Sequence, residues 1–513
     1  MKRDRPKTGF DAANRPASSY DSQPFTGHPG ALSNSVQIAI LAAITLFGAA
    51  LRFYDLGEWS LWIDEIYTID RARTHVNLTT ILREWWHPSL SVILTGLSLE
   101  WLGVSEFTAR LGSAVIGIVS IPVLYFVVRR LLGAHIALLS AGLLAVSTWH
   151  LEWSQSARYL TSLALLYILA LLAFFLASEG RGWRYVAAFY ILAVLALGER
   201  FIAASLGPVV VVYVLLLRVL RFPAPAHYRT RYLAALLIPG IAAVAIDLVR
   251  LLINGESFFL SWAALTYDRP ISSPLSMAVM ITRAIGVPVV VLGAFAGFRL
   301  VMERNRPGLL LFSSAVVPIA LVLLLNPLLF TKDRFAFVTL PGWIALTAAG
   351  VWFLARQADG RVRVMAVGLA VALFADAMSS NAAYFRINNG HRLDWRRAFE
   401  TVDSLAQPGN AVVAWWPEFG RYYTSKQITP WAEIDSTAVL DSRRAYWFVL
   451  DGETINGNRA MRLWVEREAR LMAVYYLQTG RNDYLRVYRY EPQVPGCAMG
   501  PPECSADSPG DMR

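Results

Sequence analysis

Charged residues are scarce in this 513-residue sequence. Asp, Glu, Lys and Arg together make up 16% of it, whereas about 25% is usual for a soluble protein. Hydrophobic residues account for 56%. This composition excludes an ordinary soluble enzyme and predicts that most of the chain lies in lipid.

Cysteine is almost absent as well. The only two, Cys497 and Cys504, lie in the segment CAMGPPECS near the end of the sequence. Two alternatives stay open for them: a small disulfide loop on an oxidising side of a membrane, or two free thiols in a flexible tail. A metal site is not expected there, because no histidine lies nearby.

The sequence also lacks the basic arms that bind nucleic acid. Its formal net charge is +10, but the basic residues are scattered between apolar runs. No lysine-rich segment occurs, and no segment interleaves basic with aromatic residues. We therefore expect no nucleic-acid partner, and we interpret the basic surplus as a signal of membrane topology.

No cleavable signal peptide and no internal repeat are found. Residues 1–34 are polar and rich in Pro, Ser, Asp and Arg, which predicts a disordered cytoplasmic tail. The missing repeat weighs against the transporter folds that are built from inverted repeats.

Long apolar runs are abundant instead, and eleven of them have spanning length. They lie near 35–54, 110–128, 135–151, 159–178, 183–199, 201–217, 232–252, 277–298, 308–329, 336–355 and 362–383. A twelfth run, 88–104, is shorter and contains Ser, Thr and Glu. The pattern predicts a polytopic all-α membrane domain over residues 35–389, with about eleven transmembrane helices.

The distribution of arginine orients these helices. If residue 34 is cytoplasmic and 88–104 does not cross, every inner loop is basic. The inner loops then hold Arg129, Arg130, Arg181, Arg184, Arg218, Arg221, Arg229, Arg231, Arg299, Arg304, Arg306, Arg356, Arg361 and Arg363. A crossing at 88–104 would reverse this bias. We therefore predict that 88–104 is an interfacial or re-entrant helix on the outer side of the membrane.

The composition changes from about residue 390. DWRRAFETVDSLAQPGN and NRAMRLWVEREARL have helical spacing, while AVVAWW, AYWFVLDG, MAVYYL and YLRVYRYE resemble strands. These segments predict a small extracytoplasmic α/β domain over 390–495. A flexible tail, 496–513, is expected to follow it.

An acidic pair follows the first predicted span, in the segment GEWSLWIDEIYTIDRA. Asp64 and Glu65 are framed by Trp, Leu, Ile and Tyr side chains that favour a bilayer interface. This frame would fix the pair at a set depth at the outer surface. The alternative is a solvated acid pair, or a partner for Arg71 or Arg73.

Further candidates lie on the same predicted surface. His87 precedes the interfacial helix, and Arg158 and Tyr159 end the segment WHLEWSQSARY. An outward arginine suits a phosphate, which it grips with two parallel hydrogen bonds. The alternative for Arg158 is a simple pair with Glu152.

Two outer turns add ionisable groups near membrane depth. One turn carries Glu199 and Arg200, and the other carries Lys332, Asp333 and Arg334. Carboxylates act as general bases, and arginines stabilise a departing phosphate. A polyprenyl-phosphate sugar and a hydroxyl or amine acceptor together need both kinds of group at a bilayer surface.

These motifs, in this order and spacing, resemble those of the GT-C glycosyltransferases. The matching segments are LWIDE, HPSL, SEFTARLGSAVIG with LYFVVRRLLG, and WSQSARY. They are similar in particular to the bacterial relatives of protein O-mannosyltransferases and of the lipid A aminoarabinose transferase. The resemblance extends over about residues 35–400 and implies transfer of a sugar, with inversion, from a polyprenyl-phosphate donor to an extracytoplasmic lipid, glycan or protein.

The resemblance also implies roles for individual residues. Asp64 aligns with the family's base, and Glu65 would support it. Arg158, Tyr159 and Arg334 match family positions, and Arg200 lies where relatives often carry Lys or His near the lipid phosphate. His87 and Lys332 complete the expected substrate-binding set, which is Arg158, Tyr159, Arg200, Lys332, Arg334 and His87.

The sequence departs from the family at two motifs. The family usually has His-Pro-Pro-Leu where this chain has HPSL, and often has Ser-Gln-Glu-Ala-Arg where this chain has Ser156 in place of Glu. In distant oligosaccharyltransferase subunits, acids in the corresponding loop help to bind a divalent metal. The loss of this acid favours a metal-independent reaction, with no cofactor expected and a divalent metal as the alternative.

Two other function classes fit the hydropathy. A transporter or flippase for lipid-linked glycans would place charges along a central pathway. An O-antigen ligase or polymerase is not expected to carry Asp-Glu in its first outer loop. The acidic pair therefore favours the glycosyltransferase.

Overall fold

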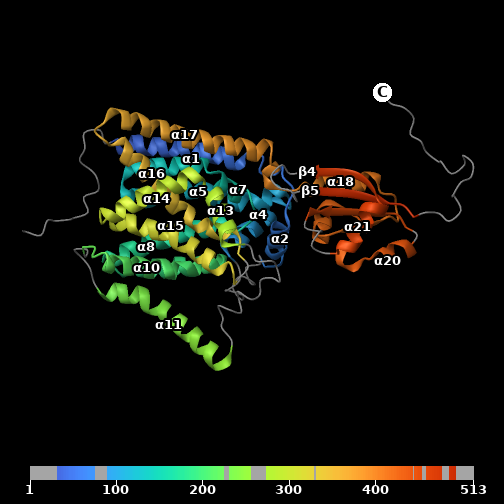
Figure 1. Cartoon of the computed structure of the whole chain (residues 1–513), viewed down its shortest axis with the longest axis horizontal. Coiled ribbons are helices and arrows are strands. Elements are labelled where there is room, and N and C mark those ends of the chain that lie inside the picture. The colour runs from blue at the N-terminus through green and yellow to red at the C-terminus, as the bar shows by residue number, and fades with distance from the viewer. Residues whose placement is uncertain are drawn as a thin grey trace, which may run out of the picture.

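The protein was analysed as a computed structural model, which describes residues 32–75, 89–223, 230–255, 273–328, 331–442, 444–452, 458–476 and 484–492. Figure 1 shows a bundle of long helices with a smaller α/β body at one end. Four residues named above, His87, Arg229, Cys497 and Cys504, lie outside the described ranges, and so does the predicted tail 496–513.

Within the described ranges, eight helices are long and apolar enough to cross a membrane. They are α1 (Asn34–Phe53), α5 (Glu106–Leu132), α8 (Leu160–Ser178), η1 (Phe201–Ser205) with α10 (Leu206–Val219), α11 (Thr230–Asn254), α15 (Arg306–Leu325), η2 (Asp333–Thr339) with α16 (Leu340–Ala355), and α17 (Gly360–Arg386). The prediction of a multi-pass helical membrane protein is confirmed.

Two further predicted spans are broken. Helices α6 (Ala134–Val146) and α7 (Thr148–Ser154) meet at 60°, and α13 (Pro274–Ile285) and α14 (Val287–Met302) meet at 92°. Counting each bent pair as one span gives up to ten among the described residues. The remaining predicted span corresponds to α9 (Trp183–Glu199), which has 17 residues.

The run predicted not to cross forms α4 (Leu90–Leu102), a helix of 13 residues. At about 1.5 Å per residue it extends for roughly 20 Å, which is less than the thickness of a hydrocarbon core of about 30 Å. Glu199 binds its first turn, accepting hydrogen bonds from the backbone N–H and the hydroxyl of Ser91 at 3.0 and 2.7 Å. The length of α4 agrees with an interfacial helix.

A buried arginine stabilises the break between α6 and α7. The end of a helix leaves carbonyl groups without partners, and lipid offers none. Arg52 from α1 donates to the carbonyls of Leu144 and Ala145 at 3.1 and 2.7 Å, and its Nη2 lies 3.0 Å from Nδ1 of His150. The bent α7 can therefore turn side chains such as Glu152 toward a cavity in the bundle.

The α/β body contains the helices and strands that the sequence predicts. They are α18 (Trp395–Leu405), β1 (Ala411–Ala414), β3 (Tyr446–Asp451), α21 (Arg459–Glu468), β4 (Arg470–Tyr476) and β5 (Tyr484–Tyr490). The short strand β2 (Ile428–Pro430) and the helices α19 (Gly420–Tyr423) and α20 (Ser436–Asp441) are not predicted by the pattern. The strand order is β2-β1-β3-β5-β4, with β2, β1 and β3 parallel and the other two pairings antiparallel.

The α/β body packs against helix α2 (Ile63–His75), which carries the acidic pair in its first turn. Leu61 and Ile66 share a buried cluster with Trp395 and Phe419. The hydroxyl of Tyr423 accepts a hydrogen bond from the backbone N–H of Leu61 at 2.7 Å. Helix α2 is thus held between the bundle and the α/β body.

Polar contacts extend this interface on both sides of α2. Tyr422 donates to Asp70 at 2.8 Å, and Arg421 pairs with the same carboxylate at 3.1 Å. Arg396 of α18 pairs with Glu106 at the start of α5. These contacts fix the two bodies relative to each other through one short helix.

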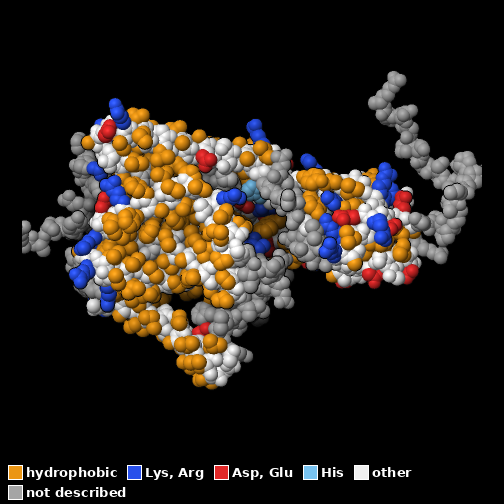
Figure 2. All heavy atoms as spheres, in the orientation of Figure 1, with side chains coloured by type: hydrophobic (Ala, Val, Ile, Leu, Met, Phe, Trp, Pro, Cys, Tyr) orange, Lys and Arg blue, Asp and Glu red, His pale blue; other side chains and the backbone are white. Residues whose placement is uncertain are grey.

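The surface of the bundle is apolar. Figure 2 shows hydrophobic side chains over most of the visible bundle, with Lys and Arg gathered at the end opposite the α/β body. Accumulation of positive charge at one end is the arrangement that orients a membrane protein. The orientation itself stays a prediction.

Candidate active site

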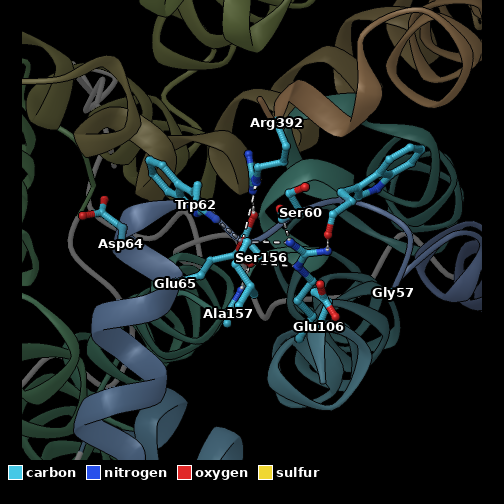
Figure 3. A network of polar contacts seen from close by, with 12 residues as sticks. Gly57, Ser60, Trp62, Asp64, Glu65, Glu106, Ser156, Ala157 and Arg392 are labelled. Carbon is cyan, nitrogen blue, oxygen red and sulfur yellow. Dashed lines mark hydrogen bonds and ion pairs between the residues drawn. The ribbon is translucent and has the colours of Figure 1, made fainter. Parts of the chain in front are cut away.

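Asp64 lies among arginines at the end of the bundle that faces the α/β body (Figure 1). One oxygen of its carboxylate, Oδ2, is 3.0 Å from Nη2 of Arg334 and 3.4 Å from Nη2 of Arg158. The side chain is 23% exposed. Figure 3 shows that it points away from Glu65, toward the other side of helix α2.

These neighbours set the charge of Asp64. Burial raises the pKa of its carboxyl, but the cations Arg158, Arg334, Lys332 and Arg200 lower it by more, so the pKa lies below the usual aspartate value. The free site therefore holds an ionised carboxylate that is a weak base. The same cations are arranged to receive a second anion.

Arg158 is fixed by contacts with helix α2. Its Nη1 donates to the backbone carbonyl of Asp64 at 2.9 Å and lies 3.3 Å from the hydroxyl of Thr68. The structure pairs Arg158 with Asp64, whereas Glu152 lies 3.4 Å from His391. The alternative of a simple Arg158–Glu152 pair is therefore wrong.

Tyr159 links two of the predicted cations. Its ring centre lies 5.1 Å from the guanidinium carbon of Arg158 and 5.5 Å from that of Arg200. The structure thus brings together Asp64, Arg158, Tyr159, Arg200 and Arg334, which come from four separate segments of the chain.

Glu65 faces the opposite way and is fully buried. Its two oxygens accept hydrogen bonds from Nε and Nη2 of Arg110, both at 2.9 Å. They also accept from the backbone N–H of Ala157 at 2.9 Å and of Trp62 at 3.2 Å. Burial raises the pKa of this carboxyl. Arg110, Arg392 and the Ala157 N–H lower it by more, so the pKa of Glu65 lies below the usual glutamate value.

Arg110 completes a buried network around the loop before α2. It donates to the backbone carbonyls of Leu56, Trp59 and Ser60 at 2.9 to 3.1 Å. Sequence reasoning did not single out Arg110, although an arginine at the start of an apolar helix needs a partner. Because every hydrogen-bonding position of Glu65 is occupied within the protein, its place suits a structural role.

Trp62 separates the two acids and gathers three arginines. Its ring centre lies 5.0 Å from the guanidinium carbon of Arg392, 5.3 Å from that of Arg334 and 6.0 Å from that of Arg158. Arg392 also donates to the hydroxyl of Ser156. Ser156, which replaces the family's acid, thus receives a cation from the start of the α/β body.

A cavity of about 1000 Å³ opens beside this cluster. Trp62, Lys332, Arg334 and Arg392 belong to its wall, so two of the predicted cations line it. Apolar side chains from α6, α13, α14, α16 and α17 form another part of the wall: Leu143, Met277, Met280, Ala284, Ile285, Val289, Leu340, Ile344 and Leu373. The cavity is therefore suited to a molecule with an anionic group and an apolar chain.

A metal ion would need several His, Cys, Asp or Glu side chains close together. Among the residues that the structure describes, no group of three or more His, Cys, Asp or Glu is arranged to hold a metal ion. Because His87 lies outside those residues, metal independence stays a prediction.

A family profile described as dolichyl-phosphate-mannose-protein mannosyltransferase matches residues 86–244. A search of curated proteins found no match.

Solved structures match over most of the chain. ArnT from Cupriavidus metallidurans in the apo state has 14% identity and a TM-score of 0.55, with 89% of this chain and 98% of ArnT covered. The same protein bound to undecaprenyl phosphate gives a TM-score of 0.54 at 14% identity, with the same coverage. AglB, an archaeal oligosaccharyltransferase from Archaeoglobus fulgidus in complex with an inhibitory peptide and a dolichol-phosphate, has 14% identity and a TM-score of 0.55, covering 88% of this chain and 74% of AglB. The chain has the fold of GT-C membrane glycosyltransferases, which confirms the resemblance drawn from the motifs.

The buried pair predicts a large effect of a small change. Glu65→Gln keeps the shape of the side chain but leaves the charge of Arg110 buried without a counter-charge. Removing one partner of a buried ion pair costs about 3–5 kcal/mol. We expect Glu65→Gln to lower the free energy of unfolding in detergent by about 3–5 kcal/mol.

An exposed pair provides the matched control. Glu303 lies 2.8 Å from Arg299 and is 47% exposed. Glu303→Gln should cost about 0.5 kcal/mol or less. Equal losses for Glu65→Gln and Glu303→Gln would show that the Glu65–Arg110 pair does not support the fold.

Proposed function

We propose that the chain is an integral membrane glycosyltransferase that moves a sugar from a polyprenyl-phosphate donor to a hydroxyl or amine acceptor on the outer side of the membrane. One observation carries this proposal. The carboxylate of Asp64 contacts Arg334, and Arg334 also lines a cavity that has both cationic and apolar walls.

The cavity offers a place for the donor. Lys332, Arg334 and Arg392 would bind the carrier phosphate, and the apolar wall would take the first isoprene units. The carriers named with the solved structures, undecaprenyl phosphate and dolichol-phosphate, belong to this chemical class. The site geometry and the comparisons therefore support the same kind of donor.

The reaction would be a single displacement at the anomeric carbon. The acceptor oxygen or nitrogen forms the new bond to this carbon while the bond from the carbon to the phosphate oxygen breaks. The bonding electrons leave with the phosphate, whose growing charge Arg334 and Arg158 would stabilise. The proton of the acceptor passes to the carboxylate of Asp64, and the configuration at the anomeric carbon inverts.

Glu65 would act in this reaction as a positioning residue rather than as a base. It holds the backbone of Ala157 and the loop before α2, and so keeps Arg158 in contact with Asp64. Asp64 is the acid of the pair whose carboxylate stays partly exposed. This assigns the base to Asp64 alone.

A transporter fits the site less well. The ionisable residues described above gather around Asp64 and at one cavity, whereas a transport pathway would distribute them along the bundle. The buried network that fixes the loop before α2 also favours a preorganised catalytic site.

A transfer assay with purified protein tests this function. Undecaprenyl-phosphate sugars that differ in the sugar would be offered with a mixture of lipid and peptide acceptors. We expect one donor to be consumed, and Asp64→Asn should lower its turnover by about 10²–10⁴-fold, because a general base is lost.

Folding must be checked beside this loss of activity. Asp64→Asn should keep the melting temperature near that of the unchanged protein, since Asp64 is not part of the buried network. A variant that keeps more than about a tenth of the turnover would remove Asp64 from the role of base. Consumption of no donor by the unchanged protein would contradict the proposed function.

The pH dependence should differ between the free site and the donor complex. A bound phosphate adds negative charge beside the cations that lower the pKa of Asp64, so this pKa should rise when the donor binds. Because kcat/KM reports the free enzyme and kcat reports the complex, the acid limb of kcat should lie at the higher pH. Activity profiles between about pH 4 and 8 would show this difference. Coinciding limbs would mean that the phosphate does not bind near Asp64.

The two-pronged grip of Arg158 gives another test. Arg158→Lys keeps the positive charge but removes the planar guanidinium, whose two Nη atoms contact the backbone carbonyl and the carboxylate of Asp64. We expect turnover to fall about tenfold or more, as for the loss of one hydrogen bond to a charged group. Arg397→Lys, at a residue that is 72% exposed, is the control and should change turnover little. Equal turnover in both variants would exclude Arg158 from the site.

A further inference from the structure

The cavity is lined by acids that the proposed reaction does not use, and one of them is paired with a histidine. Glu152 of α7 and His391 both line it, and Nδ1 of His391 lies 3.4 Å from Oε2 of Glu152. The two side chains are 17% and 34% exposed, so both remain accessible from the cavity. A paired carboxylate and imidazole at this position therefore need an explanation.

The backbone that carries His391 is in an unfavourable conformation. Asn389, Gly390 and His391 have φ values of +47°, +58° and +56° in succession. The left-handed region is costly for residues other than glycine, and such residues gather at functional sites. Gly390 is required here, because a Cβ atom would lie 2.6 Å from the ring of Trp59.

This turn gives two neighbouring side chains different partners. Arg392 enters the network around Glu65 and is 4% exposed, with Nε 3.7 Å from the Glu65 carboxylate. His391 instead faces the cavity, where its ring meets the ring of Tyr384 edge-on at 5.3 Å. The rigid network that holds Arg392 thus also fixes the position of His391.

The charges of the cavity separate the two parts of a donor. Glu152 lines the cavity beside His391. Asp333, in contrast, stands between Lys332 and Arg334, whose two positive charges outweigh its own. A carboxylate repels a phosphate. The phosphate therefore belongs beside Lys332 and Arg334, and the neutral part of the donor belongs beside Glu152. Carboxylate oxygens accept hydrogen bonds from sugar hydroxyls, and a neutral imidazole both donates and accepts them.

We propose that Glu152 and His391 form the subsite that binds hydroxyl groups of the sugar on the carrier phosphate, and so select the sugar. This assignment rests on the proposed function, since it needs a polyprenyl-phosphate sugar in the cavity. It makes the strained turn at residues 389–391 a device for sugar recognition. Hydroxyls of the acceptor are the competing ligand, and the experiment distinguishes the two.

The test compares two ligands of the purified full-length protein. The first is undecaprenyl phosphate without a sugar, and the second is the undecaprenyl-phosphate sugar that the unchanged protein consumes. Glu152→Gln and His391→Asn should each weaken binding of the second ligand about tenfold, as expected for one lost hydrogen bond to a charged or aligned group. Binding of the first ligand should stay unchanged for His391→Asn, and for Glu152→Gln it should change no more than it does for Asp376→Asn.

The choice of asparagine protects the turn. Asparagine adopts the left-handed region more readily than most residues, so His391→Asn removes the imidazole and keeps the backbone. Asp376→Asn is the control for charge, because Asp376 lines the same cavity. This change should affect both ligands alike, since it acts only through the field on the phosphate.

Each contrary result has a distinct meaning. Equal weakening of both ligands by Glu152→Gln and His391→Asn, with a lower melting temperature, would show a purely structural pair and overturn the inference. A raised KM for the acceptor alone would overturn it in favour of acceptor binding. If the unchanged protein binds neither undecaprenyl ligand, the proposed function itself fails.

Discussion

The buried pair of Glu65 and Arg110 is the interaction on which the site depends. Arg110 binds three backbone carbonyls before α2, and Glu65 binds the N–H groups of Trp62 and Ala157. One ion pair thereby joins the loop before α2, the start of α5 and the segment that carries Arg158. The main effect of this pair is to fix the positions of the groups around it, because a buried ion pair contributes little net stability.

Adjacent acids in one helical turn diverge because they point to different sides of α2. Glu65 enters the protein and finds a complete set of donors, while Asp64 meets only cations and stays partly exposed. A carboxylate surrounded by arginines is a poor base until another anion shares them. Donor binding would therefore raise the basicity of Asp64 at the moment when a base is required, and would protect the site from reacting without its donor.

Local sequence patterns predict the parts of this structure that depend on local physics. Hydropathy locates the spans, the aromatic frame locates Asp64, and alternation locates β1, β3, β4 and β5. Local patterns do not predict the partners of Glu65 and Ser156, because these partners are distant in the sequence. Arg110 lies 45 residues from Glu65, and Arg392 lies 236 residues from Ser156. No periodicity records such pairings, although the Asn-Gly turn signal before His391 points to the strained segment.

Trp62 and Arg334 connect the surroundings of Asp64 with the cavity, and the proposed reaction would need both places. Trp62 borders the cavity and carries the arginines that face Asp64, while Arg334 contacts Asp64 and lines the cavity. A donor in the cavity and an acceptor beside Asp64 would approach each other across this one residue pair. Because the α/β body supplies Arg392 and clamps α2 through Tyr423, any movement of that body would shift both environments together. The α/β body is thus a structural component of the site, and the catalytic geometry belongs to the whole chain rather than to the membrane bundle alone.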